Sequence, residues 1–293
     1  MDSGRYYHIV QRQRSAQLAE IASEPAEILL QILEDGIRMI HMQPGSGRLC
    51  GLDEIRFTGR LSGSQKMEQF RNFIPDSLLS EASFSRITIA VEPVSFSLLP
   101  KNLFSTESAP VCLEIAGNFQ SSDVLFSEYL HPEMMLDFSV SREWTEWASG
   151  VFHASEINWS CNFSGLLQFA AGQMPEEDAL LAHIGPGTMH VFGRKNGQLC
   201  FFNRFRYQTE QDLLYFFLLA MEQSALDPES SPVFLSGSIM SGSAGFEKIN
   251  RYAGNLRFVL PPEVNSDLPP SAGIRHPQYF DLLALTSKNS ITA

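Results

Sequence analysis

Apolar positions along the chain repeat every second residue in several short runs, each bounded by a turn. The clearest set begins at residue 179, where runs over 179–184, 188–193 and 198–205 predict three antiparallel strands. Glycine-rich steps separate the runs, namely Gly185-Pro186-Gly187 and Lys195-Asn196-Gly197. Because these turns are short, consecutive strands are expected to pair as a meander.

A helical repeat follows this meander. Thr209 with Asp212 three residues later predicts a capping box for a helix that runs to about residue 224. This helix is apolar nearly all round, so we expect it to be sandwiched between layers. A short buried strand is predicted over 233–236, then a helix capped by Ser243 and ended by Gly254, and a closing strand over 256–260.

A less regular copy of the same order begins near residue 27. Runs over 27–33, 37–43 and 51–58 predict three strands, and the Asp35-Gly36 step between the first two predicts a type I′ turn with positive φ. Further elements are expected as a helix within 64–79, a buried strand at 86–92, paired strands at 123–129 and 134–140, a helix after Ser141, a strand at 156–160 and a helix through 166–170.

These patterns divide the chain into four parts. Residues 1–25 lack strand alternation and are expected to form a frayed terminus or a short helix. Residues 26–175 form the first α/β unit, and residues 176–262 form the second. Residues 263–293 are a proline-punctuated linker followed by a short helix.

A three-strand antiparallel meander followed by helix, strand, helix and strand is the order of the ribonuclease-H-like unit. Beside this order stand the segments 96–100 and 233–246 and the residues Tyr207, Asp212 and Tyr215. On these features the chain resembles an uncharacterised bacterial family with the actin-like ATPase fold, and is distantly similar to pilus-assembly and secretion-platform members of that superfamily. The resemblance implies an α/β fold of two tandem ribonuclease-H-like units.

The resemblance also implies where a nucleotide site would lie. Actin-like ATPases hold phosphate and Mg²⁺ in two Asp-x-Gly hairpin turns, in which the carboxylate anchors metal-bound water. In this chain the first turn is Asp35-Gly36, without an intervening residue. The second keeps Gly185 and Gly187 but has His183 in place of the acid, and imidazole is a poor ligand for Mg²⁺.

The adenosine side of such a site would be formed by Gly237 and Ser238. An ordinary strand-to-helix turn with an N-cap serine explains the same residues, and this interpretation is preferred. All these turns are therefore interpreted as a vestigial nucleotide site, with no catalytic residue and no metal ligand. The spacing of the seven histidines matches no metal-binding motif.

Composition excludes several function classes. The net charge is -12 in 293 residues, which argues against a nucleic-acid groove and against an anionic membrane surface. No apolar stretch has the length of a membrane span, so membrane insertion is not expected and the cytoplasm is the expected location. The four cysteines are far apart and are expected to be buried free thiols, Cys200 among them.

The sequence favours a non-catalytic cytoplasmic interaction or scaffold protein, which binds a protein partner or a second copy of itself and needs no cofactor. The alternative is a divergent nucleotide-binding protein or weak ATPase that takes ATP with Mg²⁺. Trp144 and Trp147, on one face of a predicted helix, are interpreted as core residues, and a partner-binding groove is the alternative.

Overall fold

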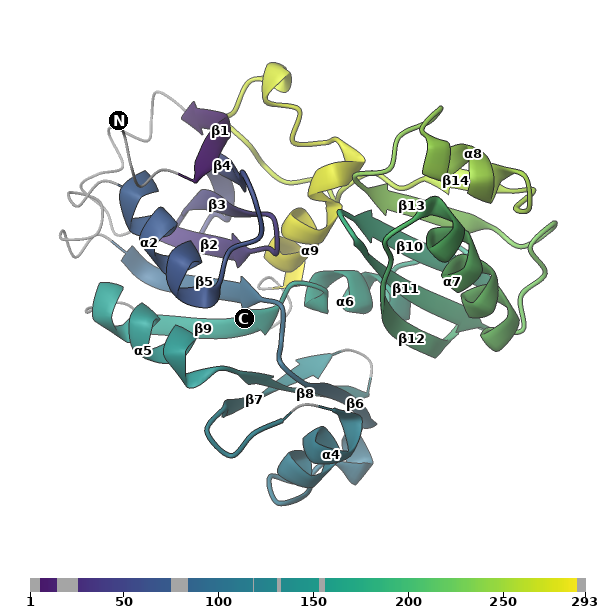
Figure 1. Ribbon diagram of the computed structural model, residues 1–293, viewed down its shortest axis with the longest axis horizontal. Helices are drawn as coiled ribbons and strands as arrows, with labels where there is room; N and C mark the ends of the chain where they lie inside the picture. The colour runs from purple at the N-terminus through teal and green to yellow at the C-terminus, as the bar shows by residue number, and fades with distance from the viewer. Residues whose placement is uncertain are drawn as a thin grey trace. The chain divides into compact units, whose positions relative to one another are not determined.

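The computed structural model describes residues 6–14, 26–74, 84–117, 119–130, 133–152 and 156–288 (Figure 1). The chain divides into two compact units. The first unit comprises residues 1–162 and 264–272, and the second comprises residues 163–263 and 273–293. No helix in the described part of the chain is long and apolar enough to span a membrane.

A six-stranded sheet is the centre of the first unit. Its spatial order is β1 (Tyr7–Arg14), β4 (Arg48–Phe57), β3 (Gly36–Gln43), β2 (Ala26–Ile32), β5 (Phe84–Val91) and β9 (Glu156–Cys161). Strands β2, β3 and β4 form an antiparallel meander, and β5 and β9 run parallel to β2. The strands predicted near residues 27, 37, 51, 86 and 156 are therefore confirmed.

The strand β1 corrects the prediction for the N-terminal segment. Residues 7–14 are neither frayed nor helical, because they pair antiparallel with β4 at the edge of the sheet. Ile9 and Val10 are both exposed, and the register shifts between Ile9 and Gln11. An edge strand with a bulge has no regular apolar alternation, so the two-residue repeat was absent from the sequence. Residues 1–5 and 15–25 lie outside the described residues.

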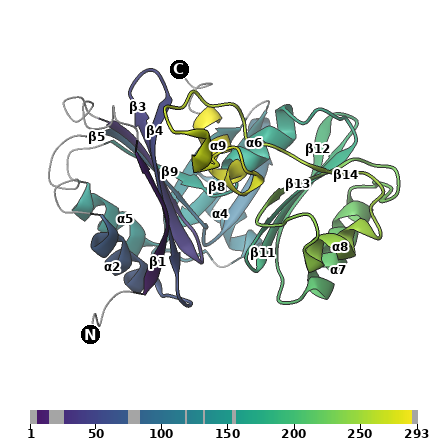
Figure 2. The same ribbon diagram turned by 90° about the horizontal axis from the view of Figure 1, so that it is seen from above.

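Two helices pack together on one face of this sheet, α2 (Gly63–Phe73) and α5 (Arg142–Val151), as Figure 2 shows. A capping box formed by Ser62 and Gln65 begins α2. The ring of Trp147 lies 5.1 Å from that of Phe70 and 5.3 Å from that of Trp144. Trp147 is buried, which confirms the core interpretation for this residue, whereas Trp144 is only half-buried. Residues 75–79 of the predicted helix lie outside the described residues.

A smaller three-stranded sheet is inserted between β5 and α5. Its order is β6 (Phe96–Pro100), β8 (Met134–Val140) and β7 (Val124–Leu130), all antiparallel. A 3₁₀ turn, η1 (Lys101–Leu103), and the helix α4 (Ser108–Ala116) connect β6 to β7. The predicted pairing of the strands near residues 124 and 134 is confirmed.

A five-stranded sheet forms the middle layer of the second unit. Its order is β12 (Gln198–Arg206), β11 (Thr188–Lys195), β10 (Ala179–Gly185), β13 (Val233–Gly237) and β14 (Leu256–Phe258). The helices α7 (Glu210–Gln223) and α8 (Ala244–Asn250) cover one face, and α6 (Ser164–Gly172) and α9 (Phe280–Lys288) cover the other (Figure 2). The 3₁₀ turns η2 (Pro270–Ala272) and η3 (Pro277–Tyr279) precede α9.

The helix α7 begins as predicted but is buried differently. The capping box of Thr209 and Asp212 is present with both of its hydrogen bonds. Only one face of α7 is buried, through Leu213, Phe217 and residues 220–221, whereas Tyr215 is 63% exposed. The expectation that α7 is sandwiched between two layers is therefore wrong. The helix packs on one face of the sheet, and it carries more apolar residues than that face covers.

The end of α8 also differs from the prediction. The helix stops at Asn250, so Gly254 is not its C′ residue. The glycine is needed for close approach instead, because a Cβ at this position would lie 2.1 Å from the carbonyl oxygen of Glu229. The amide of Gly254 donates to the carbonyl of Pro228 at 3.0 Å.

The same topology occurs in each unit. The order β4-β3-β2-β5-β9 of the first sheet corresponds to β12-β11-β10-β13-β14 of the second, with three antiparallel strands followed by two parallel ones. The boundaries differ from those expected from the sequence. Residues 163–175 belong to the second unit, and residues 264–272 return to the first, where the amide of Leu49 donates to the carbonyl of Asn265 at 2.8 Å.

Candidate functional site

The first candidate turn lies in the first unit, between β2 and β3. The amide of Leu33 donates to the carbonyl of Gly36 at 2.9 Å, which closes the loop around Asp35. The φ angle of Gly36 is not positive, so the predicted type I′ turn is wrong. A Cβ at Gly36 would lie 2.2 Å from the carbonyl oxygen of Ile55, so glycine is required by the close approach of β4.

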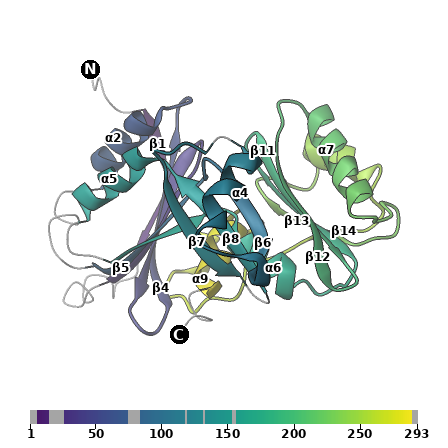
Figure 3. The same cartoon turned by 90° about the horizontal axis from the view of Figure 1, so that it is seen from below.

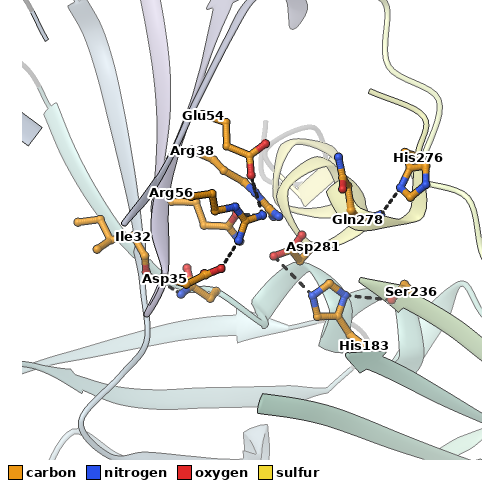
Figure 4. A network of polar contacts seen from close by, with 12 residues as sticks. Ile32, Asp35, Arg38, Glu54, Arg56, His183, Ser236, His276, Gln278 and Asp281 are labelled. Atoms are coloured by element: carbon orange, nitrogen blue, oxygen red, sulfur yellow. Dashed lines mark hydrogen bonds and ion pairs between the residues drawn. The ribbon is translucent and has the colours of Figure 1, made fainter. Parts of the chain in front are cut away.

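The carboxylate of this turn is bound by the protein itself. Asp35 forms an ion pair with Arg56, which reaches the loop from β4 (Figure 4). Arg56 also lies 2.7 Å from Glu54, and Glu54 accepts from Arg38 at 3.3 Å. Arg38 and Glu54 are both buried, and Arg38 also donates to Gln31 at 3.4 Å. The turn is therefore joined to a network that includes Arg56, Glu54 and Arg38.

The second candidate turn, Gly185-Pro186-Gly187, lies in the second unit between β10 and β11. The hydroxyl of Tyr207 donates to the carbonyl of Gly185 at 2.7 Å, and the amide of Tyr207 donates to the carbonyl of Gly187 at 3.0 Å. Burial raises the pKa of the Tyr207 phenol. Gly187 has a φ of +72°, which favours glycine here. Tyr207 therefore closes this turn.

His183 occupies the place where the resemblance implies an acid. Its Nδ1 lies 3.0 Å from the hydroxyl of Ser236 on β13 (Figure 4). Its Nε2 lies 3.7 Å from the carboxylate of Asp281 on α9. The ring of His190 on β11 lies 6.3 Å from that of His183. All four side chains are buried.

Asp281 is a site residue that sequence reasoning missed. It supplies a carboxylate beside His183 from the last helix of the chain, far away in sequence. The available signal was an acid within the apolar run Tyr279-Phe280-Asp281-Leu282-Leu283. A buried carboxylate in such a run needs a polar partner, which a histidine can provide.

Serine, histidine and aspartate also form hydrolase triads, but this arrangement does not suit that chemistry. A nucleophilic serine must reach a substrate, whereas Ser236 has no exposed surface. The distance of 3.7 Å between His183 and Asp281 exceeds that of a hydrogen bond. The cluster is therefore suited to fixing β10, β13 and α9 to one another.

The third candidate turn contains Gly237 and Ser238. Gly237 has a φ of +90°, and a Cβ there would lie 2.3 Å from the carbonyl oxygen of Ile184. The amide of Ser238 donates to that same carbonyl at 2.7 Å, so this N–H group is already used. Ser243 then caps α8 by accepting from the amide of Phe246 at 3.3 Å. These contacts are those of an ordinary strand-to-helix turn.

The cysteines and histidines do not form a metal cluster in the described part of the chain, where no group of three or more His, Cys, Asp or Glu residues could hold an ion. Cys50 and Cys161 are buried, as predicted. Cys112 is half-buried and Cys200 is exposed, so the expectation of four buried thiols is wrong. Cys200 lies on the edge strand β12, which has a neighbouring strand on one side only.

Comparisons with known proteins show which family and which fold this chain is similar to. A family model described as "Protein of unknown function (DUF3822)" matches residues 16–256. The structure is similar to a protein of Bacteroides thetaiotaomicron with an actin-like ATPase fold and unknown function, with 14% identity and a TM-score of 0.72 over 90% of this chain and 96% of that one. No curated protein matches the sequence.

Two other solved structures are also similar to this chain. A chain of the PilM–PilN type IV pilus biogenesis complex is 14% identical, with a TM-score of 0.58 over 89% of this chain and 98% of that one. The cytoplasmic domain of EpsL from Vibrio cholerae is 11% identical, with a TM-score of 0.46 over 92% of this chain and 95% of that one. The predicted resemblance and the actin-like fold class are confirmed.

Proposed function

The chain belongs to the DUF3822 family of unknown function, and on that premise we propose that it is a non-catalytic cytoplasmic scaffold or interaction protein on an actin-like ATPase fold. Its partner is another protein or a second copy of the chain. The fold is compatible with such a role, because a chain of the PilM–PilN complex shares it at a TM-score of 0.58. At 14% identity this likeness concerns the fold alone.

The ion pair between Asp35 and Arg56 is the observation that carries the proposal. Mg²⁺ prefers oxygen ligands and retains most of its water, so a carboxylate that serves it must be free to face that water. Asp35 is instead neutralised by a guanidinium that also binds Glu54. If Asp35 bound a metal ion, its ion pair with Arg56 would be broken. The guanidinium of Arg56 would then lose this carboxylate next to the buried side chains of Arg38 and Glu54, which is unfavourable.

The contacts of the other two turns support the same proposal. The amide of Ser238, beside which the adenosine would lie, already donates to the carbonyl of Ile184. At the Gly185–Gly187 turn, the amide and the hydroxyl of Tyr207 bind two turn carbonyls, so this turn is closed without a ligand.

The alternative function is divergent nucleotide binding or weak ATPase activity. It is favoured by Gly187 and Gly237, whose φ values of +72° and +90° retain backbone shapes that only glycine adopts readily. It would use Asp35-Gly36 and Gly185–Gly187 for the phosphates and Mg²⁺, with Gly237 and Ser238 beside the adenosine.

Titration of the protein with a fluorescent ATP analogue, with and without Mg²⁺, separates the two functions. The proposal predicts no saturable fluorescence change at millimolar nucleotide in either condition. Saturable, Mg²⁺-dependent binding that ATP displaces, and that Asp35→Asn removes without changing the circular dichroism spectrum, would establish the alternative instead.

A further inference from the structure

The helix α4 of the first unit carries two exposed β-branched residues on one face. Val111 is 53% exposed, and Ile115 is 83% exposed, the highest value among the large hydrophobic residues of the described chain. Residues four apart lie on the same face of a helix, one turn above the other. Val111 and Ile115 therefore form a short apolar stripe, which we call the α4 stripe.

The opposite face of α4 is already packed on the β6–β8–β7 sheet (Figure 3). Ala109 and Leu113 have no exposed surface. The hydroxyl of Ser95, next to β6, donates to the carbonyl of Leu113 at 2.9 Å. Since the helix is fixed by this inner face, the α4 stripe is not part of the core of the unit.

Helix propensity does not account for these residues either. A β-branched side chain loses rotamer freedom in a helix, so valine and isoleucine are less favourable there than alanine or lysine. Val111 and Ile115 keep 53% and 83% of their surface exposed, so burial within the chain recovers only part of this cost. Single exposed apolar residues are common, but two on adjacent turns without an internal role point to burial by another molecule.

Acidic residues border the stripe and indicate what covers it. Glu107 precedes Val111 by four residues, Glu114 follows it by three, and both are exposed. The segment 108–116 contains no lysine or arginine. Lys101, in the turn before the helix, has its ammonium 4.8 Å above the ring of Tyr129. The stripe therefore combines apolar contact area with negative charge.

We propose that the α4 stripe docks a basic amphipathic helix of a partner protein, whose apolar residues cover Val111 and Ile115 and whose lysines or arginines pair with Glu107 and Glu114. This inference rests on the proposed interaction function and names a surface and a partner class for it. The acidic border disfavours a second copy of the same face, because the glutamates of the two copies would repel each other. It equally disfavours anionic lipid and nucleic acid.

Binding to a model peptide tests this proposal. The probe is a fluorescein-labelled leucine–lysine peptide of about four helical turns, with leucines at helical spacing on one face. The matched control peptide has glutamate in place of each lysine. Fluorescence anisotropy at low salt is measured for the wild-type chain and for Ile115→Ser, Val111→Ser and Glu114→Lys, with Met240→Ser as control because Met240 is 59% exposed on the second unit.

We expect the lysine peptide to bind the wild-type chain, and Ile115→Ser to weaken it by about tenfold. Glu114→Lys should weaken it at low salt, with a smaller difference at high salt because salt screens exposed charges. Met240→Ser should bind like the wild type. Since all four positions are on the surface, the variants should keep the wild-type urea midpoint.

Three results would overturn the proposal: no binding of the lysine peptide, equal binding of both peptides, or an equal loss for Ile115→Ser and Met240→Ser. Any of these removes the α4 stripe as the docking surface and leaves the scaffold function standing. The scaffold function fails separately, through Mg²⁺-dependent nucleotide binding, which the peptide experiment does not measure.

Discussion

The phenol of Tyr207 donates a 2.7 Å hydrogen bond to the carbonyl of Gly185, and so joins the end of β12 to the turn between β10 and β11. The backbone amide of the same tyrosine binds Gly187, the last residue of that turn. One residue therefore satisfies two carbonyl groups of a turn that ATPases of this fold use for phosphate.

Tyr207→Phe removes the hydroxyl and keeps the ring. We expect it to lower the free energy of unfolding by about 0.5–1.5 kcal/mol, because the carbonyl of Gly185 loses its donor. Urea denaturation measures this change, and Tyr215→Phe is the matched control because Tyr215 is 63% exposed. If the two variants were equally stable, the hydroxyl of Tyr207 would have no role in closing the turn.

Stability should depend on pH through Asp137 on β8. The side chain has no exposed surface, and burial raises its pKa, although the hydroxyl of Ser127 donates to it at 2.6 Å. A carboxyl group whose pKa is raised in the folded state contributes most to stability below its pKa in the unfolded chain, about 3.9. This stabilisation is lost as the pH rises through the pKa of the folded state.

Asp137→Asn keeps the shape of the side chain and cannot ionise. The stability of this variant relative to the wild type should therefore increase between about pH 3 and about pH 7, as Asp137 ionises in the wild type. Urea midpoints at several pH values measure the difference, with the exposed Glu133→Gln as control. A constant difference across the range would show that Asp137 ionises equally readily in the folded and unfolded chain.

Two helix N-termini give a paired test of capping. Thr209 accepts from the amide of Asp212 at 3.2 Å, whereas Ser141, at the N-cap of α5, makes no side-chain capping hydrogen bond. Thr209→Ala should cost about 1 kcal/mol of unfolding free energy, and Ser141→Ala should cost less. Chemical denaturation of both variants measures this, and a greater loss from Ser141→Ala would contradict it.

The order of strands and helices could be predicted because it depends on local patterns. The turn 195–197 shows this well: Asn196 and Gly197 have φ values of +50° and +74°, as a two-residue hairpin requires. Asp35-Gly36 gives the same signal, yet Gly36 is constrained by the carbonyl of Ile55 on another strand. The Asp-Gly dipeptide alone does not predict this contact with the carbonyl of Ile55.

The partners of the candidate site were the least predictable part. Arg56 reaches Asp35 from β4, and Asp281 reaches His183 from α9, so both pairs depend on tertiary packing. Hydrophobic periodicity locates strands and helices but does not show which polar side chains meet. The strand β1 was not predicted for a related reason. It is stabilised by its pairing with β4, whereas its own sequence lacks the apolar alternation of a strand.

Thermal unfolding with and without millimolar Mg²⁺-ATP tests the central claim most directly. With Asp35 bound to Arg56, we predict the same melting temperature in both conditions. A bound nucleotide at about 100 times its dissociation constant would add about 2.7 kcal/mol of stability. A saturable rise of several degrees, lost in Asp35→Asn but kept in the control Asp123→Asn, would contradict the account and make this chain a nucleotide-binding protein.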